Sequence, residues 1–245
     1  MSLTIVTGAG SGMGRDIALS LVSARQPVLA VGRRREPLEQ TSSLSADAAL
    51  VSVATGDLSL AADVEAIVGS IGDQAVRAIV ATAGGQGDFK KPGNSVAAIE
   101  GAWSEALGKN LFSAVLLIEA VLPGMVEDGR IVLIGSTAGL DGQGGPYATA
   151  KAALHGYARD LARRAGKRRI TVNAIAPGFV ADTEFFEAGG YGDSAKMVDQ
   201  VAAQTLVGRV GKPEDITACT EWLLSERAGW VTGQTISVNG GVLMS

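Results

Sequence analysis

The chain has 245 residues, which is enough for one large domain or two small ones. Hydrophobic residues make up 47% of it but aromatic residues only 4%, which indicates a core of small aliphatic side chains, as in parallel strands covered by helices. The net charge of -4 provides no global basic field and argues against nucleic acid or an anionic membrane as a partner.

Cysteine usage and the apolar runs indicate where the protein works. The single cysteine, Cys219, excludes an internal disulfide and a cysteine-rich zinc site, and it suits a reducing compartment. The first residues, MSLTIV, lack the pattern of a signal peptide. The apolar run AVLLIEAVLPGM is interrupted by Glu119 and Pro123, so no membrane span is expected. We therefore expect a soluble, cytoplasmic protein.

Seven Val- and Ile-rich runs recur along the chain, at 3–7, 27–32, 49–55, 76–84, 129–136, 168–178 and 234–241. Helical patterns lie between them, at 14–24, 36–44, 61–71, about 96–126 and 147–166. Strands that alternate with helices form βαβ units with right-handed crossovers and hence a parallel sheet. The sequence therefore predicts an α/β fold, in which residues 1–245 form a single doubly wound Rossmann-type domain with a seven-stranded parallel sheet flanked by helices.

The least regular stretch is 181–211, which follows APGF at the end of the sixth predicted strand. Open α/β sheets bind their ligands at the carboxyl ends of the strands, and a long loop in a compact domain is usually functional. We interpret 181–211 as a substrate lid, with a plain surface excursion as the alternative.

Four glycines lie between the first predicted strand and the helix that follows it: Gly8, Gly10, Gly12 and Gly14. Glycines let the backbone approach a pyrophosphate, and the start of a helix offers free N–H groups. The spacing does not match G-x-G-x-x-G but matches T-G-x-x-x-G-x-G, beginning at Thr7. The loop is a candidate dinucleotide site, and a simple strand-to-helix turn is the alternative.

The end of the second predicted strand indicates which dinucleotide is bound. An acidic residue near this point binds the ribose 2′-hydroxyl of NAD, whereas arginine accommodates the 2′-phosphate of NADP. Here Gly32 is followed by Arg33 and Arg34. Guanidinium groups pair well with phosphate, so NADP(H) is favoured over NAD(H). Solvated surface arginines are the alternative.

A second set of residues suggests carbonyl chemistry. Ser136 lies at the end of the fifth predicted strand, and Tyr147 and Lys151 follow it, four residues apart on one face of a helix. An ammonium group beside a phenol stabilises the phenolate and lowers its pKa from about 10. Tyr147 is therefore a candidate general acid/base, although Tyr–Lys pairs at this spacing also occur by chance.

Taken together, these motifs resemble those of the classical short-chain dehydrogenase/reductases. The similar pieces are TGAGSGMG, GDLS, KNLFSAVLL, IGSTAG, YATAK, NAIAPGFV and VTGQTISVNGG, and they cover nearly the whole chain. The C-terminal segments, including VGRVGKPEDI, look most like those of the 3-oxoacyl-acyl-carrier-protein reductases. The resemblance implies an oxidoreductase.

The resemblance also implies roles for individual residues. Tyr147 would give its proton to the substrate carbonyl while Ser136 binds the reacting oxygen. Lys151 would bind the nicotinamide ribose, and Asn110 would support a water chain to Lys151. The implied cofactor contacts are Gly8, Ser11, Gly12, Met13, Gly14, Arg33, Arg34, Asp57, Leu58, Ala83, Gly84, Tyr147, Lys151, Pro177, Gly178, Val180 and Thr183. No metal site is implied.

The chain departs from the family pattern at three places. The usual NNAG is ATAG here, so Ala81 replaces an asparagine that braces the sheet beside the cofactor. The interval from Ser136 to Tyr147 is shorter than usual, and Thr137 is the alternative serine equivalent. Thr183 lies one position later than the threonine that contacts the carboxamide.

Several other residues are chemically suggestive. His155 is the only histidine, but the chain lacks the G-x-S-x-G motif and the residue order of a serine hydrolase, so we expect it to serve packing or a subunit contact. Cys219 is expected to lie in a helix core. The basic segment 163–169 is a solvated helix end or, alternatively, a dock for an acidic carrier protein.

The sequence hypothesis is therefore an NADPH-dependent carbonyl reductase, with 3-oxoacyl thioesters linked to a carrier protein or coenzyme A as one candidate substrate class. The alternatives are an NAD(P)-linked alcohol, sugar or steroid dehydrogenase of the same family, and a non-catalytic nucleotide sensor on the same fold. The resemblance also implies a homo-oligomer, either a dimer or a tetramer.

Overall fold

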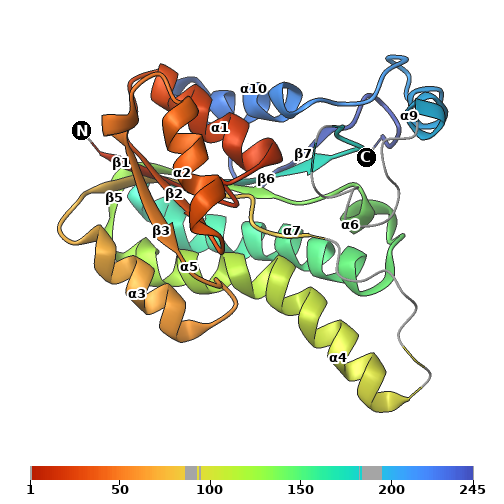
Figure 1. The fold of residues 1–245 in the computed structure, drawn as a ribbon, viewed down its shortest axis with the longest axis horizontal. Helices are drawn as coiled ribbons and strands as arrows, with labels where there is room; N and C mark the ends of the chain where they lie inside the picture. Colours follow the sequence, from red (N-terminus) through yellow and green to blue (C-terminus); the bar gives the residue numbers. More distant parts are fainter. Residues whose placement is uncertain (1, 86–92, 94, 182, 184–194, 245) are drawn as a thin grey trace.

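The computed structural model describes residues 2–85, 93, 95–181, 183 and 195–244. Seven parallel strands form one sheet in the order β3-β2-β1-β4-β5-β6-β7 (Figure 1). The strands are β1 (Leu3–Thr7), β2 (Val28–Gly32), β3 (Val51–Thr55), β4 (Val76–Ala81), β5 (Met125–Ile134), β6 (Thr171–Pro177) and β7 (Thr235–Val238). This arrangement confirms the predicted doubly wound sheet.

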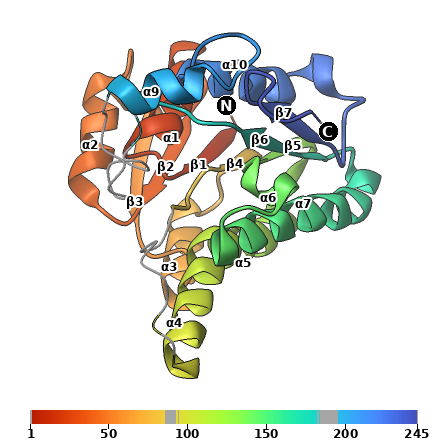
Figure 2. The ribbon, with the colours of Figure 1, turned by 90° about the vertical axis from the view of Figure 1, so that its right-hand side faces the viewer.

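Helices cover both faces of the sheet, as Figure 2 shows. The helices of the described residues are α1 (Gly12–Ser23), α2 (Arg35–Leu44), α3 (Ala61–Ile71), α4 (Val96–Leu107), α5 (Ser113–Val121), α6 (Ala138–Asp141), α7 (Gly145–Ala165), α9 (Ala195–Ala202) and α10 (Pro213–Leu224). One core cluster joins α3, α5 and α7 to the sheet, and the other joins α1, α2 and α10 to its opposite face. Successive strand residues serve opposite clusters, as Ile5 and Val6 do, because side chains alternate along a strand.

The strand order reverses at β1, which pairs with β2 on one side and β4 on the other. In register, Thr4 lies opposite Val28 of β2 and Ala78 of β4. The chain crosses to opposite faces of the sheet after these strands, so a crevice opens beyond their carboxyl ends. The glycine loop, the two arginines and the ATAG segment all follow strands at this edge.

The long helical region predicted at about 96–126 is divided into parts. A π-helical turn (Gly108–Phe112) separates α4 from α5, and β5 begins at Met125. By length and composition, Val96–Gly124 could cross a membrane, with a mean hydropathy of 1.5. Its α5 part, however, buries Leu117 and Ile118 in the core beneath the sheet. A core helix of a soluble protein has the same composition.

The predicted lid at 181–211 lies partly outside the described residues, which exclude 182 and 184–194. Within the described part, α9 and a bridge from Val180 to Gly211 are present. The backbone N–H of Ala181 also donates to the Gly211 carbonyl at 2.9 Å. The two ends of the excursion are therefore joined beside β6.

Candidate active site

A cavity of about 340 Å³ opens at the carboxyl edge of the sheet. Fourteen of the predicted site residues line it: Gly8, Ser11, Gly12, Met13, Gly14, Arg33, Arg34, Asp57, Leu58, Ala83, Gly84, Tyr147, Lys151 and Thr183. Its lining also includes residues that the sequence analysis did not name as contacts: Gly10, Gly32, Pro37, Leu38, Gly56, Thr82, Gly85, Lys109, Ser113, Ile134 and Gly135. One cavity therefore joins the glycine loop, the arginines and the Tyr–Lys pair.

The glycine loop brings bare backbone to the floor of this cavity. Gly8 and Gly12 have φ angles of +65° and +48°, which side-chain-bearing residues rarely adopt. A Cβ on Gly14 would lie only 2.3 Å from the carbonyl oxygen of Gly8. Ser11 occupies the N-cap position of α1, so the first N–H groups of that helix face the loop. The loop thus fits a pyrophosphate that needs close backbone approach and N–H donors.

Thr82, the residue after β4, braces this loop, and the sequence analysis missed it. Its hydroxyl donates to the carbonyl of Thr7, while the Thr7 hydroxyl accepts the N–H of Ala83 at 2.9 Å. A Cβ on Gly14 would also lie 2.7 Å from Thr82 Oγ1. Ala81, which stands where the family pattern NNAG has an asparagine, lacks a polar side chain. The next residue, Thr82, therefore ties the end of β4 to β1. The available signal was a threonine at a strand end beside the missing asparagine.

The opposite end of the cavity is cationic. Arg33 follows β2 directly, and Arg34 is the N-cap residue of α2. Asp57 accepts hydrogen bonds from the backbone and side chain of Ser59 at 2.9 and 2.7 Å. These two bonds, with smaller contributions from the charges of Arg33 and Lys109, lower the pKa of Asp57 below its ordinary value. The carboxylate is therefore ionised and lies within the field of both cations.

Ser136, Tyr147 and Lys151 meet where β5 ends and α7 begins. Tyr147 is the third residue of α7, and it shares a hydrogen bond with the Ser136 side chain. Lys151 Nζ donates to the carbonyl of Ile134 at 2.8 Å and lies 5.9 Å from the centroid of the Tyr147 ring. The predicted trio is therefore assembled, with Ser136 as the partner of Tyr147.

The pKa of Tyr147 differs from the sequence expectation. Burial raises it to about 12, and the hydrogen bond from Ser136 offsets only part of that rise. The predicted lowering by Lys151 is wrong for this arrangement, because the ammonium donates to the Ile134 carbonyl rather than to the phenol. Burial likewise lowers the pKa of Lys151 to about 8. Tyr147 therefore carries its proton at neutral pH, as a proton donor to a carbonyl must.

Lys151→Met is expected to stabilise the fold. Below pH 8 both the folded and unfolded states hold the Lys151 proton, and burying the cation costs about 3 kcal/mol. The variant also loses the hydrogen bond to Ile134, which destabilises it by about 1 kcal/mol and offsets part of this gain. The Tm at pH 7 should therefore rise by roughly 5 °C. Between pH 8 and 10.5 the unfolded state binds the extra proton, so the wild type gains stability and the difference shrinks.

Thermal unfolding at pH 7 and pH 10 measures this effect. The exposed Lys167→Met, near the end of the same helical region, is the control and should leave Tm unchanged. A lower Tm for Lys151→Met at pH 7 would contradict the cost of burying this cation.

Asn110 is buried in the π-helical turn. Its amide donates to the carbonyls of Gly85 and Ala106 at 2.9 and 3.1 Å, and its oxygen accepts the N–H of Gly85 at 3.0 Å. A Cβ on Gly84 would lie 2.8 Å from Asn110 Oδ1 and 3.2 Å from Lys151 Nζ. Asn110 therefore holds the backbone that borders Lys151; its implied part in a water chain stays a prediction.

The four predicted contacts near β6 are divided by the cavity boundary. Thr183 lines the cavity, donates to the carbonyl of Val180 at 3.1 Å, and would be 3.2 Å from a Cβ on Gly12. Pro177 ends β6, Gly178 bonds to the strand beside it, and Val180 is buried. These last three support the cavity edge without lining it, as is also true of Asn110 and Ser136.

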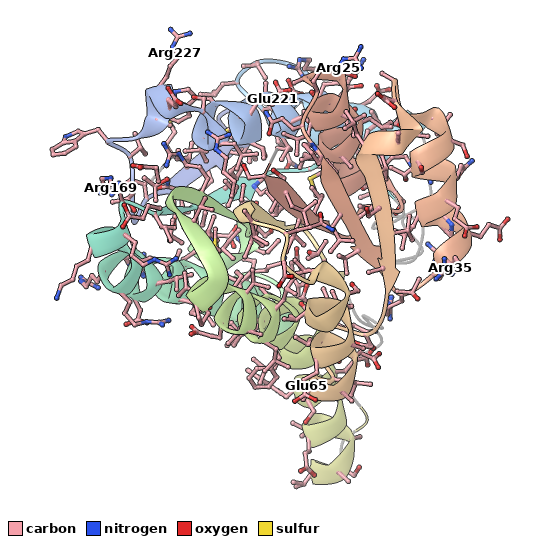
Figure 3. The ribbon with its side chains drawn as sticks, turned by 90° about the vertical axis from the view of Figure 1, so that its left-hand side faces the viewer. Arg25, Arg35, Glu65, Arg169, Glu221 and Arg227 are labelled. Carbon is pink, nitrogen blue, oxygen red and sulfur yellow. The ribbon has the colours of Figure 1, made fainter. Side chains whose placement is uncertain are left out.

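The basic segment 163–169 is largely paired within the molecule. Arg164 pairs with Glu119 and Asp160, and Arg169 pairs with Glu127 and Asp128. Arg168 donates to the backbone carbonyls of Leu122 and Met125. In Figure 3 Arg169 lies on the side of the molecule opposite Arg35, which begins α2. These pairings favour a structural helix end over an acidic-carrier dock.

Two further sequence expectations concern reactive groups. Cys219 is half-buried in α10, and burial raises the pKa of its thiol to about 11, which fits a packing role. Among the described residues no group of three His, Cys, Asp or Glu side chains could hold a metal ion.

The fold and the site are those of an oxidoreductase, and comparison with known proteins agrees. A family model described as enoyl-(acyl carrier protein) reductase matches residues 8–243. The chain belongs to the short-chain dehydrogenase/reductase family.

Relatives match over nearly the whole chain. The 3-oxoacyl-[acyl-carrier-protein] reductase FabG of Pseudomonas aeruginosa is 36% identical over 252 residues, which cover 99% of this chain and 98% of the relative. The enzyme of the same name from Escherichia coli is 33% identical, with coverage of 99% and 97%. A Brucella melitensis structure described as a short-chain dehydrogenase/reductase, glucose/ribitol dehydrogenase, has a TM-score of 0.89 at 26% identity and covers 100% of this chain and 97% of that one.

Proposed function

We propose that this protein is an NADP(H)-dependent reductase of carbonyl compounds, with Tyr147 as the general acid. The observation that carries the proposal is that Tyr147, hydrogen-bonded to Ser136, lines with Lys151 a cavity whose far end holds Arg33 and Arg34. A simple nucleotide sensor would use the arginine end, but it would require no proton donor beside the cofactor.

The residues present fit a nicotinamide dinucleotide. The bare backbone of the glycine loop would hold the pyrophosphate, and Asp57 and Leu58 would border the adenine. When bound, the cofactor supplies the hydride for reduction or accepts it in the reverse direction. Lys151 would hold the ribose hydroxyls at the nicotinamide end, where its ammonium already lies close to Gly84 and Tyr147.

Proton delivery follows from the side chains. The Tyr147 hydroxyl, kept protonated by burial, would donate to the carbonyl oxygen of the substrate. Ser136 would donate a hydrogen bond to the same oxygen and stabilise the charge that develops on it. The proton leaves Tyr147 for the carbonyl oxygen of the substrate as the new alcohol forms.

A preference for NADP(H) rests on the end of β2. Gly32 provides no carboxylate to receive a ribose 2′-hydroxyl, whereas Arg33 and Arg34 both line the cavity there. A 2′-phosphate would form charge-assisted hydrogen bonds with guanidinium groups at this place.

The substrate class we propose is the 3-oxoacyl thioester, attached to a carrier protein or to coenzyme A. The support is the activity for which the relatives are named, which match 99% of the chain at 31–36% identity. The alternative substrates are the alcohols, sugars or steroids on which dehydrogenases of the same family act.

A substrate panel run in parallel with NADPH and NADH tests the proposal. Acetoacetyl-coenzyme A, a sugar ketone and a steroid ketone are supplied at equal concentration, and cofactor oxidation is followed by absorbance. We expect turnover of the thioester with NADPH. Activity confined to the other ketones would overturn the thioester assignment, and no turnover of any ketone would overturn the reductase.

We also propose that the chain works as one domain in a cytoplasmic homo-oligomer, a dimer or a tetramer. The family match over residues 8–243 supports the single domain. Exposed apolar side chains on α4 and the turn after it, namely Val96, Ile99, Trp103 and Phe112, support association between copies. Light scattering coupled to size exclusion measures the state directly.

A further inference from the structure

His155 is a buried polar side chain that the proposed chemistry does not use. It lies on α7, one turn after Lys151 and two turns after Tyr147, and only 3% of its surface is exposed. Its Nε2 atom has no hydrogen-bond partner among the described residues. A buried polar atom without a partner costs free energy, so a hydrophobic side chain at this position would give a more stable protein.

The surroundings of the imidazole show what it contacts. A Cβ on Gly135 would lie 2.4 Å from His155 Nε2, and a Cβ on Gly139 would lie 3.0 Å from His155 Cε1. Gly135 directly precedes Ser136, and Gly139 lies three residues after Ser136, in α6. The segment 135–139, which leads from β5 into α6, is called the Ser136 turn. The ring is therefore packed against this segment on both sides of Ser136, at positions where only glycine leaves it room.

Three residues on one face of α7 thus hold three consecutive residues at the end of β5. Lys151 bonds to the carbonyl of Ile134, His155 packs on Gly135, and Tyr147 bonds to Ser136. The first and third contacts involve groups of the proposed reaction. The second contact, at Gly135, lies between the other two along the strand end.

The imidazole is neutral in this place. Burial lowers the pKa of His155 to about 4, with smaller contributions from the charges of Arg159 and Lys151. A neutral ring adds no charge to the site, so its effect there is one of shape.

We propose that His155 is a positioning residue, a spacer that sets the Ser136 turn at the correct distance from Tyr147. The inference rests on the proposed reductase function. It assigns the only histidine to the placement of the serine hydroxyl rather than to packing alone.

A double-mutant cycle with Ser136 tests the inference. We expect His155→Leu to lower kcat for the best ketone of the panel about tenfold, with an unchanged NADPH Kd measured by fluorescence titration and an unchanged or higher Tm. In a Ser136→Ala background, His155→Leu should cost less than about twofold, because no serine hydroxyl is left to position. A general structural role predicts equal losses in both backgrounds, and that result would overturn the proposal.

A second cycle tests the contact itself. Gly135→Ala alone should lower kcat by more than about tenfold, and removing the ring in Gly135→Ala/His155→Ala should recover part of that loss. Gly139→Ala is the matched control: its Cβ would lie 2.7 Å from the backbone N of Ala152, so removing His155 should not rescue it. Equal rescue at both glycines, or none at Gly135, would overturn the spacer.

Hydrogen exchange separates this inference from the proposed function. The N–H groups of Gly135 and Thr137 donate to Ile175 and Pro177 at 2.7 and 3.0 Å. In His155→Ala these amides should exchange faster than in the wild type, while amides of the distant strand β2 exchange as before. Unchanged exchange at 135–139 overturns the spacer, whereas a wild type inactive on every ketone overturns only the reductase.

Discussion

Tyr147→Phe is expected to lower kcat/KM for ketone reduction by about 10²- to 10⁴-fold, because it removes only the proton donor. The ring stays, so the packing around it is kept. The Ser136 hydroxyl loses its partner but can still bind the substrate oxygen. Initial rates with NADPH at pH 7 measure the loss.

Cofactor binding is the control for this variant. The pyrophosphate and adenosine ends of the cavity lie on the glycine loop and β2, away from the phenol, so the NADPH Kd should change by less than about threefold. Ser136→Ala should give a smaller loss of kcat, because a hydrogen bond is removed and the acid remains. A Tyr147→Phe protein with wild-type activity would revive the non-catalytic nucleotide sensor.

Arg33→Ala is expected to lower kcat/KM with NADPH by about 10- to 100-fold and to leave the value with NADH within about twofold. The lost interaction is a charge-assisted bond to the 2′-phosphate, which NADH does not carry. Parallel titrations with the two cofactors give both constants. The result would be a protein with little preference between them.

Arg35→Ala is the matched control for Arg33→Ala. Arg35 is exposed on α2, pairs with Glu39 at 3.4 Å and does not line the cavity. Its removal should leave both cofactor constants unchanged, which separates a local contact from the general positive charge of the segment. A wild type that prefers NADH would refute the role assigned to Arg33.

Local patterns were sufficient to predict most of the fold. The apolar runs marked all seven strands, since buried parallel strands are continuous hydrophobic segments. The four-residue spacing of Tyr147 and Lys151 placed both on one face of α7 because a helix has a fixed period. The glycine spacing located the cavity floor because segments of backbone approach each other there so closely that only glycine fits.

The remaining features depend on contacts between distant parts of the chain. The π-helical turn around Asn110 has no local signal, because it forms where the buried amide bonds to Gly85. The tie between Thr82 and Thr7 joins residues 75 positions apart. The pKa of Tyr147 was predicted in the wrong direction because it depends on burial, which spacing alone does not reveal.

The pairing of β1 with β4 has a consequence for how the protein is made. During synthesis β1 leaves the ribosome first, and β2 can pair with it soon afterwards, but its other partner follows some seventy residues later. Closing that interval has an entropic cost, so this pairing forms slowly relative to local contacts. The loop after β1 gains its Thr82 tie only then. A nascent chain that ends before β4 thus carries the glycine motif without a finished cofactor site.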